Sequence, residues 1–163
     1  MILWLAFGSI FGVWNVFQSS GLDFRLIAVG ALLPLAIDAP FGHMSYAHTL
    51  LSGVVVLVLA MGLTAGRGKR LRRRRALSLS IGWFAGLVLS GAWAYKEVFW
   101  WPAFGTSMPD DAPLFPALPL AIALEIAGAA AAFWVWTRFG LADAERRSEF
   151  ARTGRLRVEE SSR

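Results

Sequence analysis

The chain has 163 residues, of which 56% are hydrophobic and 17% charged, and its formal net charge is +5. Soluble domains usually carry about 25% charged residues. The cations here stand in two blocks beside apolar segments, which indicates a membrane protein and argues against nucleic-acid binding. The absence of cysteine excludes disulfides, thiolate metal sites and a cysteine nucleophile.

Five apolar segments alternate with polar or charged connections. A helix needs roughly twenty apolar residues to cross a hydrocarbon core of about 30 Å. Helices are the default in lipid because they satisfy their own backbone hydrogen bonds. The sequence therefore predicts an all-α, polytopic transmembrane helix bundle of about five spans, at residues 2–17, 24–40, 46–64, 77–95 and 114–136.

The first two segments are the shortest and leave one alternative open. Segment 2–17 follows Met1 without a basic region, so we interpret it as a retained span and not as a signal peptide. Segment 24–40 contains Pro34 and ends near Asp38, so it either spans the membrane or is re-entrant. If it spans, the N-terminus is expected outside, and if it is re-entrant, the N-terminus is expected on the cytoplasmic side.

The basic blocks predict the orientation of the bundle. Lys and Arg accumulate in cytoplasmic loops, so we expect loop 67–75 and the C-terminal tail to be cytoplasmic. The domain boundaries that follow are a transmembrane helical domain at 1–140 and a cytoplasmic charged tail at 141–163, which forms a short helix or a disordered end. The cations expected to contact the bilayer through its anionic lipids are Arg67, Lys69, Arg70, Arg72, Arg73, Arg74 and Arg75.

Ionisable residues in or beside the apolar segments are candidate site residues, because a charge at bilayer depth is costly. Asp38 and Glu125 lie within such segments, and His43 and His48 flank the turn between the second and third. Carboxylates and imidazoles together suit Zn, Mn or Fe, so the candidate ligands of a divalent metal are Asp38, His48, His43 and Glu125. The alternatives are an interfacial helix cap for Asp38, an interfacial residue at the N-terminal end of the third segment for His48, and a structural hydrogen bond for Glu125.

The fourth segment also carries small residues at helical spacing, at Gly82, Gly86, Ser90 and Gly91. Small residues let two transmembrane helices approach closely. We therefore predict a helix-packing face there.

Two stretches of the chain resemble the bacterial membrane-bound metal-dependent hydrolase-like family of inner-membrane proteins. That family shows Leu-Pro-Asp-x-x-Asp followed by His-Ser/Thr-Leu-Leu, and later His-x-x-x-Asp shortly before Trp-Pro. The corresponding stretches here are Leu-Leu-Pro-Leu-Ala-Ile-Asp at 32–38 with Tyr-Ala-His-Thr-Leu-Leu at 46–51, and a later block at 87–102 that ends in Trp-Trp-Pro. The resemblance covers about residues 29–105.

Asp38 and His48 match the polar positions of the family, whereas Leu35, Gly86 and Ser90 stand where the family has Asp, His and Asp. The resemblance implies a bacterial inner-membrane protein with an incomplete metal site and a structural or binding role toward a lipid or a partner membrane protein. The alternatives are an active metal-dependent hydrolase at the outer face and a small transporter or channel subunit that uses Asp38 and Glu125.

Overall fold

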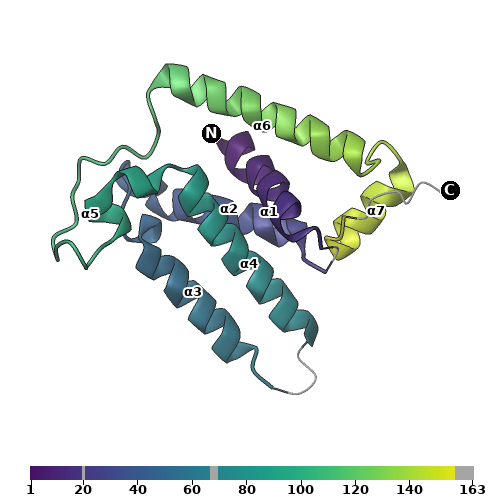
Figure 1. Ribbon diagram of the computed structural model, residues 1–163, viewed down its shortest axis with the longest axis horizontal. Helices are drawn as coiled ribbons and strands as arrows, with labels where there is room; N and C mark the ends of the chain where they lie inside the picture. Colours follow the sequence, from purple (N-terminus) through teal and green to yellow (C-terminus); the bar gives the residue numbers. More distant parts are fainter. Residues whose placement is uncertain (20, 67–69, 157–163) are drawn as a thin grey trace.

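The computed structural model describes residues 1–19, 21–66 and 70–156, and within these ranges the chain is helical with no strand. An isolated bridge pairs His43 with Pro113. The elements, in chain order, are η1 (Trp4–Gly8), α1 (Ser9–Phe17), α2 (Phe24–Asp38), η2 (Ala39–Phe41), η3 (Tyr46–His48), α3 (Leu50–Leu63), α4 (Arg70–Leu89), η4 (Ala92–Ala94), α5 (Lys96–Phe99), α6 (Leu118–Arg138) and α7 (Ala144–Thr153), as Figure 1 shows.

A helix occupies each of the five predicted segments, which confirms the all-α prediction. Within the described ranges, two helices are long and apolar enough to cross a membrane: Phe24–Phe41, with a mean hydropathy of 1.6, and Leu118–Arg138, with 1.9. The apolar helices Trp4–Phe17 and Leu50–Leu63 are shorter. The number of spans therefore stays a prediction.

Helix α4 begins earlier than the sequence predicts, at Arg70 instead of Leu77. Arginine is a good helix former, so the basic run extends the helix by almost two turns. Two of the cations predicted to contact lipid, Arg67 and Lys69, lie outside the described residues, as does the tail from residue 157 onward.

Helices α2 and α4 make the most extensive helix–helix contact of the described chain, and three glycines allow it. A Cβ atom on Gly82 would lie 2.2 Å from the carbonyl oxygen of Ile27, and one on Gly86 would lie 2.4 Å from that of Ala31. On the facing helix, a Cβ on Gly30 would lie 2.2 Å from the carbonyl oxygen of Leu79. The backbones therefore touch with no room for a side chain.

The predicted packing face on α4 is confirmed in its first half and wrong in its second. Gly82 and Gly86 face α2. Ser90 and Gly91 instead follow the end of α4. Gly91 has a φ of +77°, which ends the helical path of α4 and turns the chain into η4. A packing face requires that the helix continue, and here it does not.

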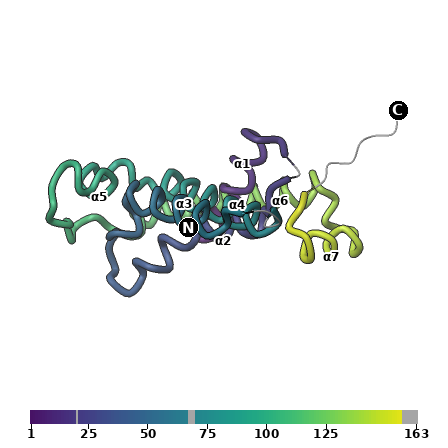
Figure 2. The backbone as a smooth tube through the Cα atoms, turned by 90° about the horizontal axis from the view of Figure 1, so that it is seen from below, coloured from purple at the N-terminus to yellow at the C-terminus, as the bar shows by residue number. Residues whose placement is uncertain are grey.

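The remaining long helices attach to this α2–α4 pair by one side each. Helix α3 packs on α4, where the ring of Phe84 lies over Gly53. Helix α6 packs on η1, where a Cβ on Gly128 would lie 2.2 Å from the backbone nitrogen of Trp4. The edge-on view in Figure 2 shows a broad, thin arrangement of helices.

Large apolar side chains cover the outer surfaces of this arrangement. On α6, Leu118 is 73% and Phe133 is 70% exposed, and on α3 Leu63 is 74% exposed. Apolar surface of this extent on a monomer marks contact with lipid or with another protein.

The elements divide between two ends of the molecule, which we name after their short helices (Figure 1). The α7 end contains the C-terminal end of α1, the N-terminal end of α2 and α7 itself. The α5 end contains the turn between α2 and α3 together with α5. Helices α1, α2 and α6 run between these ends in alternating directions.

The tail of the chain turns back onto the α7 end. The predicted boundary at residues 140 and 141 falls in the turn between α6 and α7. Of the two alternatives for the tail, its described part forms the helix α7, and the following Leu156 is buried in an apolar cluster with Phe24 and Val135. The charged tail therefore packs against the helices that precede it.

Substituting Gly82 by Ala tests the contact between α2 and α4. The new methyl group would meet the carbonyl oxygen of Ile27, so we expect the free energy of unfolding to fall by about 1–3 kcal/mol. Gly62→Ala is the matched control, because a Cβ there meets nothing within 4 Å and alanine favours a helix. Unfolding of the detergent-solubilised protein, followed by circular dichroism, measures both. Equal effects of the two substitutions would contradict the close contact.

Candidate functional site

A buried carboxylate–imidazole pair lies at the α5 end. Asp38 is the last residue of α2 and His48 is the last residue of η3, and each is 1% exposed. The Nδ1 atom of His48 lies 2.7 Å from Oδ2 of Asp38. The backbone N–H of Ser45 donates to the same oxygen at 2.7 Å. The carboxylate therefore fastens the turn 43–48 to the end of α2.

The pair has a defined chemistry. An ionised carboxylate only accepts hydrogen bonds, so Asp38 holds the proton of His48 on Nδ1 and orients the ring. This is the arrangement by which a carboxylate positions a metal-binding or proton-accepting imidazole through its other nitrogen. It is equally an arrangement by which a buried pair holds two segments together.

The other two candidate ligands lie elsewhere. His43 contacts the loop between α5 and α6: its Nε2 is 3.9 Å from Oδ1 of the exposed Asp110. Glu125 accepts hydrogen bonds from the first residues of the chain, on one oxygen from the terminal amine of Met1 and from the N–H of Ile2 at 2.7 Å, and on the other from the N–H of Leu3 at 2.9 Å. The structure thus brings Asp38 and His48 together, but neither His43 nor Glu125 joins them.

No group of three or more His, Cys, Asp or Glu side chains in the described ranges could hold a metal ion. At the three positions where the resembling family has further polar residues, this chain has Leu35, Gly86 and Ser90, and none of these side chains is a metal ligand of the His, Cys, Asp or Glu type. Leu35 is buried in an apolar cluster with Leu5 and Ala92, and Gly86 is pressed against Ala31. The hydroxyl of Ser90 donates to the carbonyl oxygen of Leu87 in its own helix. Apolar packing replaces the remaining ligands.

The later block of the resemblance does lie beside the His48 turn. The rings of Trp101 and Tyr46 meet edge to face, with centroids 5.1 Å apart. The indole Nε1 of Trp83 donates to the hydroxyl of Ser52, one turn into α3, at 3.2 Å. Trp101 therefore lies beside η3, and Trp83, which precedes the later block, joins α4 to α3.

A second buried aspartate, Asp23, organises the α7 end, and the sequence analysis did not identify it as a site. Asp23 immediately precedes α2 and is 1% exposed. Its oxygens accept from Nε of Arg25 at 3.2 Å and from Nη2 at 3.1 Å. Its backbone N–H donates to the hydroxyl of Ser78 on α4 at 2.9 Å.

The tail completes this cluster. The N–H of Phe24 donates to the carbonyl oxygen of Gly154 at 2.8 Å, and Arg25 donates to that of Ala151. Gly154 has a φ of +69°, and a Cβ there would lie 1.8 Å from Oδ1 of Asp23, so only glycine fits. The sequence signal was weak. Asp23 and Arg25 follow the short polar segment 18–21 between the first two apolar segments, and nothing in the local sequence indicates a contact with a residue 131 positions further on.

Arg74 is the cation of α4 that joins the Asp23 cluster. Its Nη2 lies 3.4 Å from the carbonyl oxygen of Leu22 and 3.5 Å from that of Thr153. Its Nε is buried and has no hydrogen-bond partner among the described residues. Arg74 precedes the apolar part of α4. The pKa of its guanidinium is lowered below the usual value, mainly because the group is partly buried and secondly because the positive charge of Arg155 is near.

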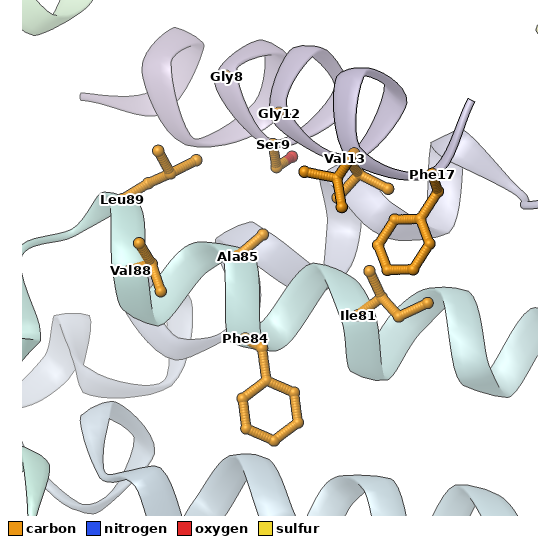
Figure 3. Close-up of a pocket in the computed structure, with 11 residues that line it drawn as sticks. Gly8, Ser9, Gly12, Val13, Phe17, Ile81, Phe84, Ala85, Val88 and Leu89 are labelled. Atoms are coloured by element: carbon orange, nitrogen blue, oxygen red, sulfur yellow. The ribbon is translucent and has the colours of Figure 1, made fainter. Parts of the chain in front are cut away.

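An apolar groove of about 450 Å³ runs between α1 and α4 (Figure 3). Phe17 and Ile81 lie at one end of it, and Leu89 lies at the other. We call it the α1–α4 groove; its walls are formed by Gly8, Ser9, Gly12, Val13, Val16, Phe17, Ile81, Phe84, Ala85, Val88 and Leu89.

Comparison of the chain with protein-family models, with curated proteins and with solved structures finds no match. The likeness to the hydrolase-like family therefore rests on the motif residues given above.

A double-mutant cycle on Asp38 and His48 tests whether the pair acts as a clamp. Removing one partner leaves the other buried without its hydrogen bond, so we expect Asp38→Ala and His48→Ala each to cost about 3–5 kcal/mol of unfolding free energy. The double mutant should cost less than the sum of the two, with a coupling of about 0.5–3 kcal/mol. Chemical unfolding of the detergent-solubilised protein gives these values.

His43→Ala is the control for this cycle, because His43 is partly exposed and its contact with Asp110 is at the surface. Such a pair contributes about 0–1 kcal/mol. Strict additivity of Asp38→Ala and His48→Ala would show that the two side chains do not stabilise each other.

Proposed function

We propose that the chain is a five-span membrane protein with a structural and binding role, built on a scaffold that resembles the metal-dependent hydrolase-like family. The observation that carries the proposal is the Asp38–His48 hydrogen bond: the two matching motif residues bind each other and the turn 43–48. Apolar packing fills the positions of the missing ligands. The pair that would have been part of a metal site now holds the turn on α2.

Two observations support the membrane assignment. The helices Phe24–Phe41 and Leu118–Arg138 have the length and hydropathy of spans, and α3 and α6 expose large apolar side chains. Helices α1, α2 and α6 also run in alternating directions between the α5 and α7 ends (Figure 1). Arginines are concentrated at the start of α4 and in α7 and its neighbours, so the positive-inside rule assigns the α7 end to the cytoplasm and the α5 end to the outer face. The resemblance assigns the membrane to the bacterial inner membrane.

One observation favours a second candidate function, a metal-dependent hydrolase at the outer face. The carboxylate of Asp38 orients the imidazole of His48 as it would for a zinc-binding histidine. A catalytic zinc site uses three protein ligands and an open position. With Asp38 as the group that orients His48, this candidate requires two further ligands to move to His48.

The metal content of the purified protein separates the two functions. Under the structural proposal, we expect elemental mass spectrometry of the detergent-purified protein to find no Zn, Mn or Fe above background, both as isolated and after incubation with each metal followed by desalting. The control is Asp38→Ala, whose content should equal that of the parent. A near-stoichiometric metal that is lost in Asp38→Ala and in His48→Ala would establish the hydrolase candidate instead.

A further inference from the structure

The α1–α4 groove is open and apolar, and a side chain could be added at one of its glycines, Gly12, without meeting a neighbouring atom at the Cβ position. A Cβ on Gly12 would meet no atom within 4 Å, in contrast to the glycines that seat α2 against α4. The groove volume of about 450 Å³ lies within the range of about 300–1,000 Å³ that ligand pockets occupy. The groove therefore has room for an apolar group that the described chain does not supply.

The face of α4 that lines the groove leads directly to Arg74. Ile81, Ala85 and Val88 lie on this face, and Arg74 precedes Ile81 by seven residues, which is two helical turns. The rise of about 1.5 Å per residue puts the arginine roughly 10 Å beyond the Ile81 end of the groove. On the α1 side, Phe17 ends the groove and Leu22, five residues later, receives the Arg74 contact.

The charges around Arg74 are unbalanced. Four guanidinium groups, those of Arg25, Arg74, Arg75 and Arg155, act on one another there, and Asp23 is the carboxylate that acts on Arg74. Asp23 is already occupied by Arg25. Arg74 makes two long contacts to carbonyl oxygens, and its buried Nε has no partner among the described residues. A buried donor without an acceptor is costly, so among the described residues the cations of this cluster outnumber its carboxylates and an anion would be favourable there.

We infer that the α1–α4 groove and the arginines at its end bind one anionic phospholipid, with an acyl chain along the groove and the phosphate at Arg74 and Arg155. This inference rests on the proposed function, because it requires the α7 end to lie at the cytoplasmic surface of a bilayer. A transmembrane helix or a second copy of the chain would need an apolar surface and a carboxylate placed at the right distance from each other to match the groove and its arginines. A lipid supplies both the apolar chain and the negative headgroup.

The test is a titration of the full-length protein, released from detergent, with dioleoyl phosphatidylglycerol and separately with dioleoyl phosphatidylcholine, followed by native mass spectrometry. We expect one phosphatidylglycerol to bind at least about fivefold more tightly than phosphatidylcholine, the preference that one arginine near the surface provides. Arg74→Gln should abolish this preference. Arg72→Gln removes the same charge from an exposed position of the same run and should preserve it.

Gly12→Leu tests the apolar half of the site. The leucine would occupy the groove without striking the protein, so it should weaken the binding of both lipids by a similar factor and leave the headgroup preference intact. This variant also covers the case in which Arg74→Gln fails to fold, because it leaves the Asp23 cluster untouched. Arg155→Gln, at an exposed position, is the second variant of the headgroup site.

Four results would overturn the inference. If Arg72→Gln and Arg74→Gln reduced the preference for phosphatidylglycerol equally, the preference would come from the overall surface charge and not from a site at Arg74. Binding that Gly12→Leu does not change, or that inorganic phosphate matches in affinity, would mean that no acyl chain lies in the groove. A dimer that Gly12→Leu disperses would identify the occupant as a second copy. Each of these can occur in a five-span protein without metal, so failure here is distinguishable from failure of the proposed function.

Discussion

The contact between the backbones of α2 and α4 is the constraint on which the rest of the structure depends. Gly30, Gly82 and Gly86 leave no side chain at the points where the two backbones come closest, so backbone atoms of one helix meet backbone atoms of the other there. Contacts of this kind include weak Cα–H···O hydrogen bonds, and they recur where membrane helices pack on small residues. Helix α3 attaches to α4, η1 attaches to both helices of the pair, and α6 attaches to η1. Without the central contact, these outer helices would have no common surface.

A buried aspartate stands at each end of α2, and each one joins other segments of the chain to this helix. At the α5 end, Asp38 holds the turn that carries His48. At the α7 end, Asp23 holds Arg25, while its neighbours join α4 and the tail. A buried charge is tolerated when it is paired and hydrogen-bonded, so each aspartate requires its partners. The two clusters thereby fix which segments lie at which end of the central helix.

Local patterns in the sequence predicted the features that are local in the structure. The apolar runs predicted the positions of the helices. Small residues at four-residue spacing predicted the packing face of Gly82 and Gly86. The short separation of Asp38 and His48 in the sequence indicated that they lie near each other. The features that the sequence did not predict connect distant positions. Glu125 binds the first residues of the chain, and Gly154 packs on Asp23. No periodicity relates residues that are more than a hundred positions apart, so these contacts follow only from the packed structure.

The proposed topology requires that α2 cross the membrane, so that Asp23 and Asp38 lie at opposite faces. The natural absence of cysteine allows a direct measurement with single cysteines placed at exposed positions on either side of this helix, Ser19→Cys and Phe41→Cys. With a membrane-impermeant maleimide, we expect Phe41→Cys to be labelled in intact cells and Ser19→Cys only after permeabilisation. Labelling of both cysteines from the same side would contradict the account, because it would make the segment re-entrant and separate the two clusters from the two faces.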